Sequence, residues 1–181
     1  SSEANGHTAV PGEESLTISD DAAYLHYTSN ETIGGLEFDY IPQAIRVDGN
    51  DVPLVCDMSS NILSGPIDVS EFGVIYAGAQ KNIGPAGLTI VLVRDDLLGS
   101  APSTIPSLFD YQLLAEAGSM VNTPPTYAWY LSGLVFQWLK NDVGGLEAMD
   151  AMNQRKAQKL YAAIDGSRFY SNPIARQNRS R

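Results

Sequence analysis

Four short apolar runs in the first half of the chain predict β-strands. They are AYLHYT (Ala23–Thr28), VPLVC (Val52–Cys56), GVIYA (Gly73–Ala77) and LTIVLV (Leu88–Val93). Their Val, Ile and Leu residues follow one another instead of alternating with polar residues, which is typical of strands covered on both faces. The pattern therefore predicts an α/β fold with a mostly parallel sheet flanked by helices. Only about ten residues separate the last two runs, so this pair could equally be antiparallel and the sheet mixed.

The second half of the chain has a helical period. The segment TYAWYLSGLVFQWLKND (126–142) is apolar nearly all round and follows Pro124 and Pro125, which predicts a buried helix. From Gly145 onward, apolar residues recur at helical spacing with charged residues between them, and the pattern stops at Gly166. This second segment is predicted to be a long amphipathic helix.

Composition and charge exclude several classes of protein. The 181 residues include 21 acidic and 11 basic ones, a net charge of −10 that repels nucleic acid and anionic lipid. No stretch reaches the ~18 uninterrupted apolar residues of a membrane span. The single cysteine, Cys56, cannot form an internal disulfide, which fits a reducing compartment. These features favour a cytoplasmic protein.

Lys81 stands between the third and fourth apolar runs, where its surroundings are predicted to be apolar. Burial disfavours the charged form of a lysine and makes the free amine available as a nucleophile, as a covalent bond to a carbonyl cofactor requires. The alternative is a lysine at a strand end whose stem is buried and whose ammonium group reaches water. The residue alone does not decide between the two.

Asp57 directly follows the second apolar run and adds weight to the first interpretation. The carboxyl ends of strands in an open α/β sheet form ligand sites, so Asp57 and Lys81 could meet at one edge. Pyridoxal phosphate (PLP) needs a lysine and commonly an aspartate on its pyridine nitrogen. The alternative is an ordinary turn or helix-capping aspartate before Ser59.

Other chemistries lack the residues they need. The segment GAQKN has neither the glycine spacing of a phosphate-binding P-loop nor a hydroxyl residue after the lysine. One cysteine and two histidines are too few for a zinc cluster. Cys56 is interpreted as a small buried hydrophobe and His26 as a packed strand residue, neither of them catalytic.

Several segments together carry a family resemblance. They are HYTSNETIGG (26–35), CDMSSNILSGPIDVS (56–70), GVIYAGAQKNIGPAGLTIVLVRDDLLG (73–99) and NTPPTYAWYLSGLVFQWLK (122–140). In order and spacing they resemble the phosphoserine aminotransferases, PLP enzymes of the class V, fold-type I aminotransferases. The resemblance runs from about Asp21 to Arg181 and implies that the chain is part of such an enzyme.

The resemblance implies a role for each matching residue. Lys81 would bind the cofactor covalently and move a proton between the two carbons involved in the reaction. Asp57 would pair with the pyridine nitrogen, Thr32 would lie near the phenolic oxygen, and Gln80 would contact the phosphate. By themselves, Thr32 and Gln80 could equally be a loop hydroxyl and a strand-end cap.

Asn122 and Thr123 resemble a pair that reaches across a dimer interface to the cofactor phosphate of the neighbouring subunit. A homodimer with shared active sites is therefore implied. Outside the resemblance, Asn122 could be a simple turn residue before the two prolines.

The implied reaction transfers the amino group of glutamate to 3-phosphohydroxypyruvate in serine biosynthesis, with a related substrate in bacterial pyridoxine biosynthesis. Residues 1–141 would belong to the PLP-binding large domain, and residues 142–181 to a connecting helix and the beginning of a C-terminal small domain. The alternatives are another class V aminotransferase, or an inactive folded fragment with a structural or dimerisation role.

The residues that would hold the substrate of such an enzyme have no counterpart in this chain. Arg176, Arg179 and Arg181 could bind phosphate but are interpreted as surface residues. The chain alone is therefore expected to bind PLP weakly or not at all and not to catalyse transamination.

Overall fold

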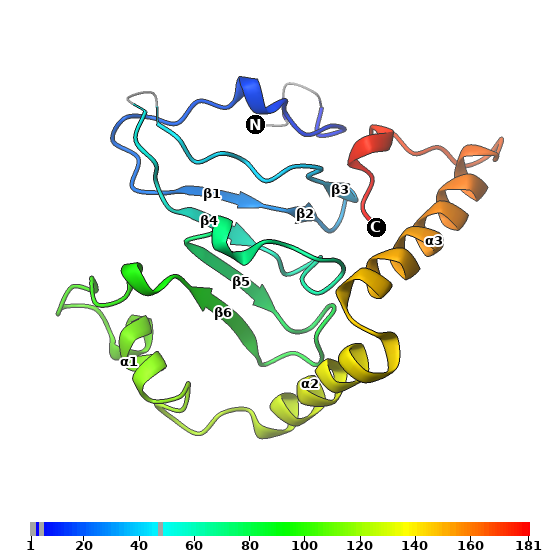
Figure 1. Ribbon diagram of the computed structural model, residues 1–181. Coiled ribbons are helices and arrows are strands. Elements are labelled where there is room, and N and C mark those ends of the chain that lie inside the picture. The colour runs from blue at the N-terminus through cyan, green and yellow to red at the C-terminus, as the bar shows by residue number, and fades with distance from the viewer. Residues whose placement is uncertain (1–2, 4–5, 47–48) are drawn as a thin grey trace.

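The sheet at the centre of the molecule has four strands (Figure 1). The computed structural model describes residues 3, 6–46 and 49–181. The strands are β1 (Leu25–Thr28), β4 (Leu54–Asp57), β5 (Val74–Gly78) and β6 (Thr89–Val93), in the order β1-β4-β5-β6. β1, β4 and β5 are parallel, and β6 is antiparallel to β5. The four predicted strands are confirmed, and the sheet is mixed.

A small hairpin that the sequence pattern did not reveal follows β1. Its strands, β2 (Asn30–Glu31) and β3 (Leu36–Glu37), pair antiparallel, with Asn30 opposite Glu37. Two-residue strands are too short to show a hydrophobic period. The residues between them, 32–35, form the tip of the hairpin.

Three α-helices follow the sheet and lie at its sides (Figure 1). They are α1 (Tyr111–Glu116), α2 (Thr126–Trp138), which continues as a π-helix (Leu139–Val143), and α3 (Leu146–Asp165). Short 3₁₀-helices lie at Glu13–Ser15, Val69–Glu71, Asp95–Leu97, Ser107–Phe109 and Arg176–Asn178. Both predicted helices are confirmed.

Glycine makes the sharp turn between the π-helix and α3. Gly144 and Gly145 have φ angles of 92° and 100°, in the left-handed region that side chains disfavour. The chain can therefore turn sharply there, and α3 leads away at the side of the sheet (Figure 1). α3 begins at Leu146 and ends at Asp165, so its predicted end at Gly166 is confirmed.

The core lies on one face of the sheet. Leu54 and Cys56 of β4 and Ile75 and Ala77 of β5 point to this face, where the segment after β4 covers them. The remaining members of the buried cluster are Met58, Ile62, Phe72, Ala79 and Ile83. Strand residues alternate between the two faces, so the neighbours of the core residues lie on the opposite face.

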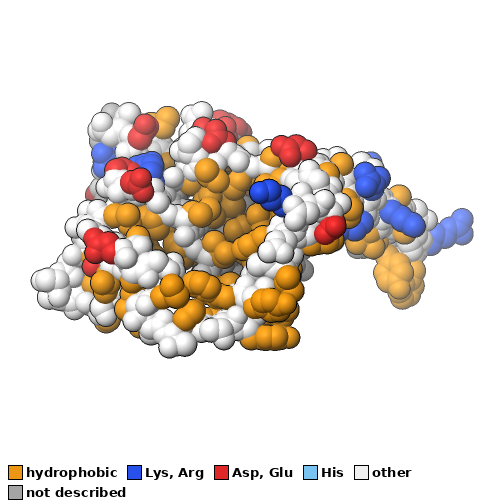
Figure 2. Space-filling model, turned by 60° about the horizontal axis from the view of Figure 1, so that its bottom comes forward, with side chains coloured by type: hydrophobic (Ala, Val, Ile, Leu, Met, Phe, Trp, Pro, Cys, Tyr) orange, Lys and Arg blue, Asp and Glu red, His pale blue; other side chains and the backbone are white. Residues whose placement is uncertain are grey.

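The edge strand β6 and the helix α2 are less covered than the sequence predicts. Leu92 of β6 is 46% exposed, and in α2 the side chains of Tyr127, Tyr130 and Trp138 are exposed. Apolar side chains accordingly gather on the face shown in Figure 2. The predictions of a β6 strand covered on both faces and of a buried α2 are wrong for this chain, because the described residues include no element that covers them.

The segment 174–181 packs against the hairpin and the loop that follows it. Asn178 is 1% exposed; its amide donates to Asp39 at 3.1 Å, and its oxygen accepts from the backbone of Val10 at 3.3 Å. Arg179 makes two hydrogen bonds to Asp165 and lies over the ring of Tyr161. With only 10% of its side chain exposed, Arg179 is not the surface residue that the sequence suggested, because α3 and this segment enclose it.

No helix in the described part of the chain is long and apolar enough to cross a membrane.

We expect Ile75→Ala to lower the free energy of unfolding by about 2–5 kcal/mol, because Ile75 is only 2% exposed and its loss leaves a cavity beneath β5. Leu160→Ala is the matched control: Leu160 is 59% exposed on α3, and the change should cost less than about 1 kcal/mol. Urea denaturation followed by circular dichroism measures both. Equal losses would contradict the assignment of the core to this face.

Candidate active site

The carboxyl ends of the three parallel strands carry the residues that the sequence singled out. β1 leads to the hairpin with Thr32, β4 ends at Asp57, and β5 leads to Gln80 and Lys81. Because the strands are parallel, these ends lie at one edge of the sheet. The topology therefore brings segments together that are about 20 to 50 residues apart in the sequence.

Two hydroxyl groups hold the amino group of Lys81. Its Nζ donates to Thr32 Oγ1 at 2.6 Å and to Ser60 Oγ at 3.0 Å, and the two hydroxyls contact each other. Lys81 itself is exposed. The turn after β5 directs Ala79 and Ile83 into the core and leaves Lys81 outside. Of the two interpretations of Lys81, the structure therefore agrees with the one in which the ammonium group is exposed, and it pairs Lys81 with Thr32.

Asp57 lies one strand away from the lysine segment and is joined to it by hydrogen bonds. Its Oδ1 accepts from the backbone N–H of Ser59 at 2.8 Å, and the hydroxyl of Ser59 accepts from the backbone N–H of Gly78 at 3.1 Å. The hydrogen bond from the Ser59 N–H to Asp57 is the turn contact that the sequence analysis gave as the alternative role of Asp57. It engages one carboxylate oxygen, so it is compatible with a cofactor role for Asp57.

Tyr76 lies beside Asp57 on the face of the sheet opposite the core. The two residues are opposite each other in the β4–β5 register. Burial, and then the charge of Asp57, raises the pKa of the Tyr76 phenol. His26 Nε2 lies 3.0 Å from the Tyr76 hydroxyl, and the two rings stack. His26 is thus a strand residue whose ring packs on Tyr76, although the side chain remains exposed.

Glu31 stiffens the loop that presents Thr32. Its carboxylate accepts hydrogen bonds from the backbone N–H groups of Gly34 and Ile33. These bonds, to Gly34 first and then to Ile33, lower the pKa of the Glu31 carboxyl, with a smaller contribution from the charge of Lys81. The Glu31 carboxylate, a charged acceptor near Lys81, therefore holds the backbone of the loop that carries Thr32.

Gln80 and the pair Asn122 and Thr123 occupy different places. Gln80 is exposed and folds back over Gly78, where an added Cβ would lie 2.5 Å from its Oε1. Asn122 and Thr123 are also exposed and lie in a groove beside β6 and α2. In the described part of the chain, no hydrogen bond links this pair to Lys81, so of the predicted site residues the hydrogen bonds connect Lys81, Thr32 and Asp57.

Sequence reasoning missed both serines of the site. Ser59 and Ser60 follow Asp57 after one residue, in the order DMSS. Two hydroxyl residues within three positions of a strand-end carboxylate are the signal that could have indicated them. Their role depends on β5 lying next to β4, which the sequence leaves open.

Cys56 fits its predicted structural role. It is fully buried in the core, and burial raises the pKa of its thiol. A thiol kept protonated in an apolar core is a poor nucleophile. The described residues also contain no group of three or more His, Cys, Asp or Glu side chains that could hold a metal ion.

Comparison with known proteins gives the family. The model of the aminotransferase class-V family matches residues 3–181. The chain belongs to the class V aminotransferases. Among curated relatives of this class V chain, phosphoserine aminotransferase of Ectopseudomonas mendocina (strain ymp) is 63% identical over 172 residues, 95% of this chain and 46% of the relative. The enzyme of the same name from Pseudomonas entomophila (strain L48) is 59% identical over 180 residues, 99% of this chain and 48% of the relative.

Solved structures give the same answer for the fold of this class V chain. Phosphoserine aminotransferase from Bacillus circulans subsp. alkalophilus has a TM-score of 0.91 and 43% identity, and the match covers 99% of this chain and 48% of that one. A PLP-bound phosphoserine aminotransferase from Trichomonas vaginalis has a TM-score of 0.87 and 42% identity, covering 96% and 49%. The predicted mixed α/β fold of this enzyme class is confirmed. The chain spans about half the length of the relatives it matches.

Proposed function

We propose that this chain supplies the cofactor lysine of a PLP-dependent phosphoserine transaminase. The reaction transfers the amino group of glutamate to 3-phosphohydroxypyruvate and gives phosphoserine and 2-oxoglutarate, in cytoplasmic serine biosynthesis. In bacteria, the related oxo acid of pyridoxine biosynthesis would be a second substrate. The observation that carries the proposal is the Lys81 amine, held by Thr32 and Ser60 at the carboxyl edge of the parallel strands.

The side chains at this edge fit PLP. An aldehyde needs an accessible amine, and Lys81 is exposed with its Nζ fixed by two hydroxyls. A pyridine nitrogen needs a carboxylate, and Asp57 lies at the end of the neighbouring strand. A phosphate needs hydrogen-bond donors, and the exposed amide of Gln80 offers two of them. When bound, PLP supplies the electron sink that makes loss of the substrate α-proton feasible.

Each residue then has a defined task. Lys81 would hold the cofactor and later act as the base that moves the proton, since the Thr32 and Ser60 hydroxyls fix its Nζ. Asp57, oriented by the Ser59 backbone N–H, would keep the pyridine nitrogen protonated. Thr32 would lie near the phenolic oxygen, and Gln80 would bind the phosphate.

We propose a homodimer in which Asn122 and Thr123 bind the cofactor phosphate of the partner subunit. Their position in the groove beside β6 and α2, outside the hydrogen-bond network of Lys81, supports a role in another subunit's site. The exposed aromatic surface of α2, which follows them, supports it as well. An apolar face of this kind is covered in most folded proteins. Residues 1–141 would form part of the large domain, and residues 142–181 the connecting helix and the beginning of the small domain.

The full-length protein is taken as a polypeptide of the relatives' length that contains this chain. In it, Lys81→Ala should abolish the PLP that borohydride fixes to the protein, and should lower the transamination rate by about 10²–10⁴-fold or more through loss of the base. Peptide mass spectrometry after reduction and a coupled assay measure the two effects. Lys156→Ala is the control, because Lys156 is exposed on α3 away from this edge. Retained turnover in Lys81→Ala would refute the proposal.

Experiments on the isolated chain test whether its residues alone can bind PLP and catalyse transamination. It contains the lysine and the carboxylate but none of the groups proposed to hold the substrate, so we expect little visible absorbance after addition of PLP and no transamination. Absorbance spectra before and after borohydride measure the first expectation. A stable adduct at Lys81 in the isolated chain would show that these residues suffice to bind the cofactor.

Subunit mixing tests the shared site. When full-length Lys81→Ala and Asn122→Ala dimers, each with low activity, exchange subunits, every mixed dimer should contain one site with neither defect. About a quarter of the wild-type activity should return in a statistical mixture. Lys81→Ala mixed with Thr32→Ala is the matched control: both residues would serve the same site within one chain, so no activity should return. Equal behaviour of the two mixtures would contradict a shared site.

A further inference from the structure

Glu37 is a buried carboxylate with no part in the proposed chemistry. It is 8% exposed, although glutamate is seldom buried unless it is paired. Its Oε1 accepts from the side-chain amide of Asn61 at 3.2 Å, and its Oε2 accepts from the backbone N–H of Arg181 at 3.0 Å. The guanidinium of Arg181 lies 3.8 Å from Oε2. Two hydrogen-bond donors and one cationic group therefore meet this carboxylate.

Asn61 joins this carboxylate to the loop that carries Ser60. Its Oδ1 accepts from the hydroxyl of Ser29 at 2.7 Å, and its backbone N–H bonds to Met58 O at 3.2 Å. Ser29 in turn donates its backbone N–H to Asp57 O at 3.1 Å. Since Asn61 directly follows Ser60, fixing the Asn61 side chain also fixes the backbone that presents the Ser60 hydroxyl to Lys81.

Glu37 also belongs to the hairpin that presents Thr32. It pairs with Asn30, and Thr32 lies at the tip between the two strands. The C-terminal segment holds the other side of the hairpin: the Ser180 backbone N–H donates to Gly35 O at 2.9 Å, and Asn30 donates to the Ser180 hydroxyl at 2.6 Å. The hairpin is thus held between Asn61 and the segment 179–181.

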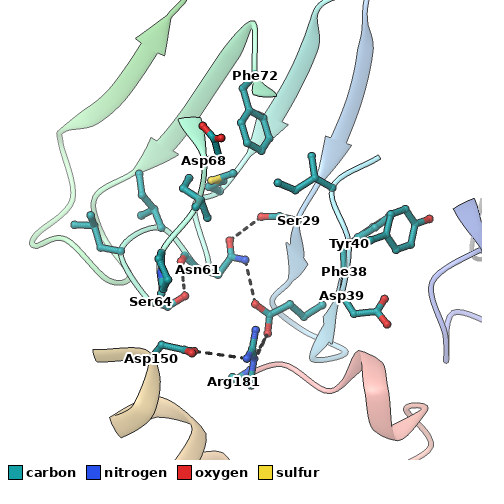
Figure 3. Close-up of a pocket in the computed structure, with 18 of the residues that line it drawn as sticks. Ser29, Phe38, Asp39, Tyr40, Asn61, Ser64, Asp68, Phe72, Asp150 and Arg181 are labelled. Carbon is teal, nitrogen blue, oxygen red and sulfur yellow. Dashed lines mark hydrogen bonds and ion pairs between the residues drawn. The ribbon is translucent and has the colours of Figure 1, made fainter. Parts of the chain in front are cut away.

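The chain of contacts crosses a pocket of about 370 Å³ (Figure 3). In this view, Ser29, Asn61 and Arg181 point toward one another, and Arg181 reaches Asp150 of α3, 3.6 Å away. The carboxylate links the two loops whose hydroxyls hold Lys81, and it contacts neither hydroxyl directly.

We propose that Glu37 is a positioning residue for the cofactor lysine: acting through Asn61 on one loop and through the hairpin on the other, it brings the Ser60 and Thr32 hydroxyls together on Lys81. The inference rests on the proposed cofactor role of Lys81. A carboxylate is required because the groups that meet it are two hydrogen-bond donors and one cation. A glutamine at this position would place its own N–H donors against one of these donor groups, where no hydrogen bond can form.

The test uses full-length protein reconstituted with PLP and measures two quantities, the Kd for PLP and the visible circular dichroism of the bound cofactor, which reports its fixed orientation. Glu37→Gln preserves shape and should raise the Kd about tenfold, as expected for the loss of one charged hydrogen bond, and should weaken the dichroism. Ser70→Ala is the control: it removes another side-chain hydrogen bond, the one to Asp68, and should change neither quantity.

A compensating pair makes the test specific. When Glu37→Gln is combined with Asn61→Asp, the introduced glutamine amide can donate to the introduced carboxylate, which still accepts from Ser29. The Kd should therefore return to within about twofold of wild type. In a Thr32→Val, Ser60→Ala background, Glu37→Gln should have no further effect, because the hydroxyls it positions are gone.

Three results would overturn the inference. Unchanged Kd and dichroism in Glu37→Gln would show that the carboxylate does not act on the site. The same effect with and without the two hydroxyls, or no recovery in the compensating pair, would leave Glu37 a purely structural residue. Failure of the proposed function is a separate result, recognised because wild-type protein itself would carry no PLP that borohydride fixes at Lys81.

Discussion

The parallel alignment of β1, β4 and β5 is the constraint on which the candidate site depends. Parallel strands place their carboxyl ends at the same edge, so the hairpin with Thr32, the turn with Ser60 and the turn with Lys81 begin side by side. Had β5 run antiparallel to β4, Lys81 would lie at the opposite edge from Asp57. The antiparallel β6 follows Lys81 in the sequence, so its direction does not change the edge at which the lysine lies.

The amine at this edge is held by polar contacts. Its neighbours in sequence suggested desolvation, yet the turn after β5 buries Ala79 and Ile83 and leaves Lys81 exposed. Its position is fixed by two hydroxyls, which are in turn fixed by loops anchored to a buried carboxylate. Orientation of the amine therefore comes from hydrogen bonds among short loops. In this chain, the residues that the same turn buries are Ala79 and Ile83, which belong to the core.

The strands and long helices could be predicted because their signals are local. The Val and Ile runs of β5 and β6 and the glycines that flank α3 are each visible within a few residues. The roles of Ser60, Glu37 and Arg179 could not be predicted, because each depends on a polar partner 14 to 24 residues away and polar residues in loops have no period. The prediction that α2 is buried was wrong for a related reason. An apolar pattern shows that a helix can be covered, but the element that covers it need not lie in the same segment of the sequence.

The exposed face of α2 and the loop with Asn122 and Thr123 form one continuous surface, since Pro124 and Pro125 lead directly from the loop into the helix. A partner that covers Tyr127 and Tyr130 near the start of α2 would also lie close to Asn122, and proline at the junction limits how far the loop can move away from the helix. The apolar face and the polar loop thus combine the two parts of a typical interface, a hydrophobic centre and hydrogen-bonding groups at its rim. In the proposed homodimer, the two residues that stand outside the Lys81 network of their own chain would lie at this interface and could reach the cofactor of the other subunit.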